Sequence, residues 1–194
     1  MLSAVMERVP PGQILTKNAK WPVLHTGRVP DLDLPSWEFK TWGLVEQPLT
    51  LSWGEFQNLP RVHIQADMHC VTSWTCLDLK WEGVSFRTVA ERTRPKPEVR
   101  HVMAYGDYDY TTNIPLEVLL DRDVLLATHE SGKPLSKDHG FPLRLVVPKR
   151  YAWKSAKWLR SLEFMDKDRR GFWERRGYHN NAEPFAEERL STQE

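Results

Sequence analysis

The most informative part of this sequence reads Asp138-His139-Gly140-Phe141-Pro142-Leu143-Arg144-Leu145-Val146-Val147-Pro148. Its run from Leu143 to Val147 is short and apolar, which predicts a β-strand. Arg144 alternates with two leucines inside that run. Because successive side chains of a strand point to opposite faces, the arginine is expected on the face away from the core.

Basic side chains gather in and after this stretch. Six of them fall within 19 residues, with almost no acid after Asp138: His139, Arg144, Lys149, Arg150, Lys154 and Lys157. Such a cluster can hold a phosphate through charge-assisted hydrogen bonds, with arginine forming paired contacts. A solvated basic face is the more common explanation of a charge run. Composition alone leaves both interpretations open.

Outward from this stretch, short strands outnumber helices. Alternating or apolar runs predict strands over residues 37–41, 49–51, 62–66 leading into 68–70, 101–105, 124–128, 143–147 and 158–164. Short helices are predicted after the Ser52/Glu55 capping box, over 85–93 before Pro95, and over 116–120 after Pro115. The sequence therefore predicts an α+β fold of mainly short mixed strands with few short helices.

The composition fits one globular domain over residues 1–194. The chain has 194 residues and is 40% hydrophobic, which is enough for a substantial core. Five prolines within residues 1–35 predict an extended arm packed on the domain, because proline fixes φ and removes a hydrogen-bond donor. Nine tryptophans are unusual for this length. Most are expected to be core or surface-lining aromatics that bury a large area, with a tryptophan-lined funnel as the alternative.

Charge and hydropathy exclude several classes of protein. The 27 basic and 26 acidic residues give a net charge of +1, which argues against a nucleic-acid binder. Mean hydropathy is −0.56, and no apolar run approaches the roughly 20 residues of a membrane helix. The N-terminus has no secretory signal pattern, and two cysteines make no disulfide framework. These features predict a cytoplasmic, reduced protein.

Cys70 lies where a predicted strand ends, before a polar Thr72-Ser73 turn. A thiolate there could bind a metal or act as a nucleophile, whereas a buried structural cysteine is the commoner case. His63, His69 and Cys70 are weighed as a zinc site. That site is disfavoured because residues 69 and 70 point to opposite sides of an extended segment. Cys76 is interpreted as structural.

Three tyrosines crowd the stretch Tyr105-Gly106-Asp107-Tyr108-Asp109-Tyr110. A loop tyrosine can donate a hydrogen bond to a substrate or carry a proton. Surface tyrosines in a turn are the more frequent explanation. The residues alone do not decide between the two.

Several segments together resemble the molybdenum-binding domain of the sulfite oxidase family. They are residues 138–148 followed by Lys154-Ser155-Ala156-Lys157-Trp158, the segment Tyr110–Glu117, the segment His69–Trp74, and the late segment Phe172–Tyr178. The resemblance spans most of the chain and is weakest over the first 30 residues. It implies a sulfite oxidase-type molybdopterin-binding fold and a molybdenum-molybdopterin cofactor.

The resemblance also implies roles for individual residues. Cys70 would be the single protein thiolate on molybdenum, and Tyr110 would face the oxo group of the metal near the substrate, so both are catalytic candidates. The pterin and its phosphate would be held by His139, Arg144, Ser155 and Lys157. Asn18 of the N-terminal arm would touch the cofactor.

The implied function is two-electron oxygen-atom transfer on a small oxyanion or an S- or N-oxide, with a separate electron-transfer partner. Val71-Thr72-Ser73-Trp74 replaces the arginine-bearing loop of the sulfite-oxidising members, so sulfite is not implied as the substrate. The cysteine loop is similar to that of a stand-alone bacterial branch, which includes a periplasmic methionine-sulfoxide reductase subunit.

Two other functions remain open. In the first, the chain is a non-catalytic module that binds a phosphorylated ligand or partner through the basic 139–157 pocket, with Cys70 in the core. The weaker one is a zinc hydrolase at His63 and His69.

Overall fold

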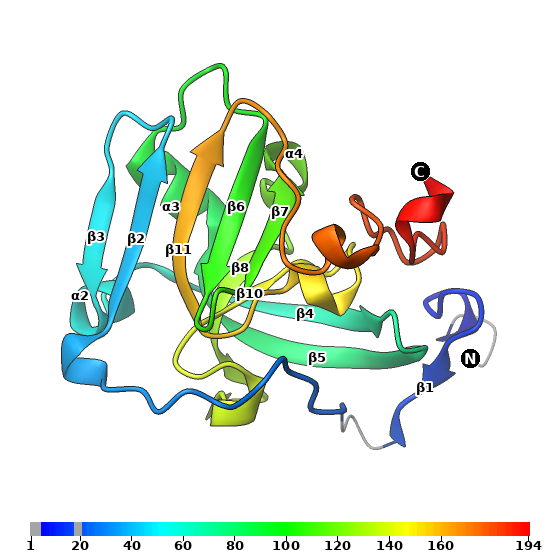
Figure 1. Ribbon diagram of the computed structural model, residues 1–194. Coiled ribbons are helices and arrows are strands. Elements are labelled where there is room, and N and C mark those ends of the chain that lie inside the picture. The colour runs from blue at the N-terminus through cyan, green and yellow to red at the C-terminus, as the bar shows by residue number, and fades with distance from the viewer. Residues whose placement is uncertain (1–4, 18–20) are drawn as a thin grey trace.

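The computed structural model describes residues 5–17 and 21–194. Two β-sheets of mainly short strands carry the fold, with few helices (Figure 1). The six-stranded sheet consists of β1 (Ile14–Leu15), β4 (Arg61–Cys70), β5 (Trp74–Ser85), β8 (Leu125–Glu130), β9 (Lys133–Pro134) and β10 (Arg144–Val146). The five-stranded sheet has the order β3 (Leu49–Ser52), β2 (Glu38–Gly43), β11 (Leu159–Met165), β6 (His101–Gly106), β7 (Thr111–Pro115). The predicted fold class is confirmed.

The helices are short and begin at the predicted places. They are α2 (Trp53–Gln57), α3 (Phe86–Thr93) and α4 (Leu116–Leu119). Ser52 caps α2, and its hydroxyl accepts from the Glu55 backbone N–H while the Glu55 carboxylate accepts from the Ser52 backbone N–H. This reciprocal pair satisfies two donors that a helix start leaves free.

The two sheets pack face to face through the largest cluster of buried apolar side chains. Phe39 and Leu162 reach it from the five-stranded sheet, and Val84, Leu126 and Leu145 reach it from the other. The seven strands expected from the sequence all form, with ends within two residues of the predicted ones. Two patterns make these strands recognisable, the period-2 burial seen in β2 and the continuous apolar run seen in β10.

Four of the described strands were not predicted: β1, β5, β7 and β9. Two of them, β5 and β7, border the candidate site. The first, β5, pairs along its length with β4 to form a long hairpin, while β7 pairs with β6. Leu79 and Trp81 are buried in β5 while Lys80 between them is exposed, so the alternation was present in the sequence. Polar residues next to this alternating stretch made the strand hard to recognise from the sequence.

Residues 21–33 run as an extended arm with no helix or strand. In Figure 1 this arm follows the lower edge of the molecule toward η2 (Leu34–Ser36). Prolines at positions 22 and 30 are consistent with that extended path. Within the described part of the chain, no helix has the length and apolar character needed to cross a membrane.

Candidate active site

A cavity of about 340 Å³ opens where the N-terminal arm, the β4–β5 turn and the segment after β9 meet. Its lining includes every predicted site residue within the described part of the chain: Cys70, Tyr110, His139, Arg144, Ser155 and Lys157. Asn18 lies outside the described residues. Side chains up to 87 positions apart in sequence thus face one space.

Cys70 is the last residue of β4 and is 7% exposed. The Thr72 hydroxyl donates a hydrogen bond to its Sγ over 3.1 Å. Burial raises the pKa of the Cys70 thiol, because the thiolate loses its hydration, and the bond from Thr72 opposes this change. The sulfur is therefore a protected soft donor that faces the cavity, and Cys76 is also free but lies fully buried in the core.

His69 lies on the other face of β4. It lines a separate hollow with Asp67, while Met68 and Cys70 line the main cavity. His63 is 79% exposed, and six residues of extended strand put it about 20 Å from His69. No group of three metal-binding side chains forms among the described residues. The zinc alternative therefore has no support in this geometry.

Arg144 is 2% exposed, yet no described carboxylate pairs with it. Its Nη1 donates to the carbonyl oxygen of His139 over 2.9 Å, and its Nη2 to that of Ser155 over 3.1 Å. The guanidinium lies over the rings of Trp21 and Trp81 at 5.0 and 5.6 Å. Burial lowers the pKa of Arg144 to about 9, and its Nε has no partner. Such a cation favours an anionic ligand.

Lys157 adds a second cation without a carboxylate partner. Its Nζ donates to the carbonyl oxygens of Leu24 and Asp138 over 2.6 and 2.8 Å. Burial, and then the nearby charge of Arg144, lower its pKa to about 7. An anion bound beside these two side chains would raise both pKa values again.

His139 is held against the N-terminal arm. Its ring stacks on Trp21, with centroids 3.8 Å apart and planes 10° apart. Burial and the charges of Arg144 and Lys157 lower its pKa to about 4, so the ring is neutral at pH 7. Its Nε2 is buried and has no partner. We call His139, Arg144, Ser155 and Lys157 the basic wall.

Two small residues shape the basic wall. The Ser155 Oγ accepts from the Val147 backbone N–H over 2.9 Å, which leaves the hydroxyl proton free. Gly140 has φ of +108°, and a Cβ there would lie 3.1 Å from the Cβ atoms of both Arg144 and Lys157. Only glycine fits both the conformation and the space.

Tyr110 precedes β7 and is partly buried, with its ring packed against the core. Its hydroxyl donates to the carbonyl oxygen of Trp153, and its ring stacks on Phe172. Burial, and then the Glu174 carboxylate, raise its pKa well above 10. The other two tyrosines of this stretch differ, because Tyr108 is exposed and Tyr105 binds Glu163 on the sheet.

Tryptophans contribute far more of the lining than the sequence indicated. Five of the nine face the cavity: Trp21, Trp74, Trp153, Trp158 and Trp173. Two of these five, Trp153 and Trp158, are also buried, so the predicted burial and a tryptophan-lined cavity occur together. Their positions in loops and at strand ends, next to polar residues, were the available signal.

The predicted basic cluster divides into two groups. His139, Arg144 and Lys157 face the cavity, whereas Lys149 pairs with Asp121 at the surface. Lys154 is 1% exposed and forms an ion pair with Glu174 over 2.6 Å. Position along the chain did not distinguish these groups.

Comparison with known proteins shows the family to which the chain belongs. Residues 26–173 match the oxidoreductase molybdopterin binding domain family. The chain is 43% identical over 185 residues to the uncharacterized oxidoreductase YuiH of Bacillus subtilis, across 95% of this chain and 92% of that protein. It is 33% identical over 108 residues to the mitochondrial sulfite oxidase of Drosophila melanogaster, across 51% of this chain and 19% of that protein.

A solved structure shares the fold. The sulfane dehydrogenase SoxCD from Paracoccus pantotrophus matches with a TM-score of 0.69 and 25% identity, over 77% of this chain and 42% of that one. The predicted family and the predicted cofactor are both confirmed. The chain belongs to the molybdopterin-binding oxidoreductases related to sulfite oxidase, and its cofactor is molybdenum-molybdopterin.

Proposed function

We propose that the chain catalyses two-electron oxygen-atom transfer on a small oxyanion or an S- or N-oxide, with Cys70 as the protein thiolate on molybdenum. One observation carries this proposal: Cys70 shares a cavity with Arg144 and Lys157, two cations that no described carboxylate neutralises. A non-catalytic module would need only the cations. The shared cavity therefore favours the enzyme over that alternative.

The residues present fit the cofactor. Molybdopterin carries a phosphate, and the basic wall offers two buried nitrogens without partners, Arg144 Nε and His139 Nε2. Buried polar atoms are nearly always hydrogen-bonded, and the Arg144 Nε–H can only donate, so an acceptor is expected at this place. The free hydroxyl proton of Ser155 and the charge of Lys157 complete a donor set for a phosphate.

The Trp21 ring, stacked on His139, lies beside the guanidinium of Arg144. Because the arm supplies this ring, we propose that the arm closes one side of the cofactor pocket. Asn18, on the same arm, remains a proposed contact with the cofactor.

When bound, the molybdenum-molybdopterin supplies the two-electron oxygen-atom transfer chemistry. Cys70 contributes a soft ligand suited to that metal. Because burial raises the pKa of its thiol, Cys70 keeps its proton in the free protein and releases it when the metal is bound. The hydrogen bond from Thr72 then stabilises the thiolate.

Tyr110 is the second catalytic-site residue that we propose. Its raised pKa keeps the hydroxyl protonated at neutral pH, and the bond to Trp153 fixes its direction. We propose that the hydroxyl exchanges its bond to Trp153 for a hydrogen bond to the bound substrate, and so orients the substrate without giving up its proton.

The two electrons enter or leave through a separate partner protein. Both cysteines are free, and the described residues contain no disulfide that could store the electrons. A cytoplasmic location stays a prediction.

The test is metal analysis of protein purified from a host that makes the cofactor. We expect about one molybdenum per chain and a fluorescent pterin on release. Cys70→Ala is expected to lose dye-coupled oxygen-atom transfer and most of the metal, whereas Cys76→Ala, the matched control, retains both. Wild-type protein without molybdenum, or Cys70→Ala with the wild-type metal content and activity, would contradict the proposal. A screen of sulfur and nitrogen oxyanions, S-oxides and N-oxides then selects the substrate.

A further inference from the structure

The turn that carries Cys70 has an unusual backbone. The Ser73 N–H donates to the Cys70 carbonyl oxygen over 3.0 Å, which closes a tight connection between β4 and β5. Ser73 has φ of 69°, a left-handed conformation that residues other than glycine rarely adopt. Such a conformation persists where surrounding contacts hold it.

The N-terminal arm supplies some of these contacts. Gln13 Nε2 donates to the Cys70 carbonyl oxygen over 3.0 Å, and the Ile14 N–H donates to the Ser73 carbonyl oxygen over 2.9 Å. Strand β1 continues this pairing onto the start of β5. The arm therefore anchors backbone oxygens at both ends of the turn.

Arg189 holds the same turn from the other end of the chain. Its Nη1 donates to the Val71 carbonyl oxygen over 2.5 Å and to the Ser73 hydroxyl over 3.3 Å. The guanidinium also lies 5.4 Å from the centre of the Tyr151 ring. Tyr151 stacks on Trp153, which lines the cavity. Arg189 thus joins the cysteine turn to the opposite wall of the site.

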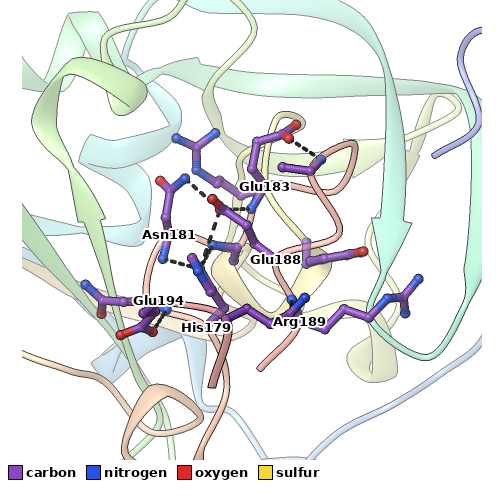
Figure 2. Close-up of polar contacts among 12 residues, drawn as sticks. His179, Asn181, Glu183, Glu188, Arg189 and Glu194 are labelled. Atoms are coloured by element: carbon purple, nitrogen blue, oxygen red, sulfur yellow. Dashed lines mark hydrogen bonds and ion pairs between the residues drawn. The ribbon is translucent and has the colours of Figure 1, made fainter. Parts of the chain in front are cut away.

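Arg189 is itself fixed by the C-terminal segment, residues 177–194. Its N–H donates to the Gln193 Oε1 over 2.9 Å, and its carbonyl oxygen accepts from the His179 N–H over 3.1 Å. In Figure 2 the Glu188 carboxylate binds Asn181 at the centre of this segment, and the Arg189 side chain extends away from that cluster.

This segment lies beyond residues 26–173, which match the family. Figure 1 shows β1 beside the tip of the β4–β5 hairpin. The Cys70 turn is therefore held from both sides by parts of the chain outside the matched residues.

We propose that Arg189 is a positioning residue for Cys70: its guanidinium holds the Val71–Ser73 turn in the conformation that directs the cysteine sulfur into the cavity. The proposal rests on the proposed function in one respect, that Cys70 is the ligand being positioned. A planar guanidinium reaches two acceptors from one rigid fork, which lysine reproduces only in part.

Amide hydrogen exchange of the full chain tests the contact directly. Arg189→Ala is expected to speed exchange in peptides covering residues 70–75 by about tenfold to a hundredfold, because charged hydrogen bonds to the turn are lost. Peptides from β2 and β6 should exchange as in the wild type. Arg189→Lys should restore part of the protection.

The matched control is Arg100→Ala. Arg100 also donates from one nitrogen to two oxygens, here the backbone oxygens of Pro97 and Val99, and neither belongs to the Cys70 turn. Its loss should leave exchange at residues 70–75 unchanged. If Arg189→Ala does not fold, Arg189→Gln takes its place.

The functional readout is the cofactor in the same variants. We expect Arg189→Ala to retain at most a third of the wild-type molybdenum after extended dialysis. At equal metal loading, its thiolate-to-metal absorption band should shift, with partial recovery in Arg189→Lys. A residue that only stabilised the fold would change neither the band nor its recovery.

Two results would overturn the proposal. One is exchange at residues 70–75 that stays within twofold of the wild type or rises equally in β2 and β6. The other is faster exchange at the turn with unchanged metal retention and absorption. Wild-type protein without molybdenum would instead refute the proposed function, while the exchange data would still decide whether Arg189 holds the turn.

Discussion

Lys154 and Glu174 form an ion pair over 2.6 Å in which both side chains are almost fully buried. The Glu174 carboxylate also accepts from the Thr112 hydroxyl over 2.9 Å and from Trp153 Nε1 over 3.0 Å. Because Trp153 lines the cavity, this pair supports the wall of the site without facing it.

Lys154→Met leaves the Glu174 carboxylate buried without its cation. Removing one partner of a buried pair costs about 3–5 kcal/mol, so the free energy of unfolding should fall by that amount. For a chain of this size the Tm should drop by about 6–20 °C. Calorimetry of the cofactor-free protein measures this change. Lys149→Met, which removes an exposed pair with Asp121, should cost less than about 1 kcal/mol. Equal losses in the two variants would contradict the structural role of the buried pair.

Gly140→Ala tests the space inside the basic wall. The new Cβ would lie 3.1 Å from the Cβ atoms of Arg144 and Lys157, at a φ of +108°. We expect loss of most bound cofactor and a stability loss above the roughly 1 kcal/mol that a left-handed alanine costs. Gly132→Ala is the control, because Gly132 also has a positive φ but no atom within 4 Å of the added Cβ. Its cost should be the backbone strain alone, with the cofactor retained. Molybdenum content and urea unfolding report the two effects.

Arg144→Met separates cofactor binding from stability. The variant removes the buried charge that the phosphate is proposed to neutralise, so molybdenum content should fall more than tenfold. The unfolding free energy of the cofactor-free protein should change by no more than about 1 kcal/mol, because the two lost hydrogen bonds are offset by removal of an unpaired buried cation. Metal analysis and denaturant unfolding measure these quantities. Undiminished cofactor content in this variant would exclude Arg144 from the phosphate site.

The pH dependence of stability tests the environment of His139. Its pKa is about 4 in the folded protein, against an ordinary value of 6.5. Between these values the unfolded chain binds the proton and the folded chain does not, so stability is lost as pH falls from 6.5 to 4. His139→Gln should reduce this loss by an amount of order 1 kcal/mol in the cofactor-free protein. His63→Gln, at an exposed position, should follow the wild type. Urea unfolding at several pH values gives the unfolding free energy of each protein. Parallel plots of this free energy against pH for all three proteins would refute the lowered pKa of His139.

Local signals in the sequence predicted most of the fold. The Ser52/Glu55 capping box acts over one helical turn, and the predicted strands are recognisable from alternating or continuous apolar side chains. Strand β5 escaped prediction because polar residues beside it are typical of turns. It became a strand because β4 and β8 pair with it on its two sides.

The chemical identity of the donors was also visible in the sequence. One soft sulfur and a run of cations are properties of residue types, and the resemblance to a family gave them a common purpose. The sequence did not show which groups surround each charged side chain in the folded protein. Lys154 and Lys157 are three positions apart, yet only Lys154 is neutralised, by Glu174.

The sequence by itself therefore determined seven of the strands, the helix starts and the set of available ligands. The tertiary structure alone decided which cations stay unpaired, which tryptophans face the cavity, and that Arg189 reaches the cysteine turn. The physical reason is how far apart along the chain the interacting residues lie. Backbone conformation depends on neighbours a few residues away, whereas burial and charge pairing depend on segments that meet only when the chain has packed.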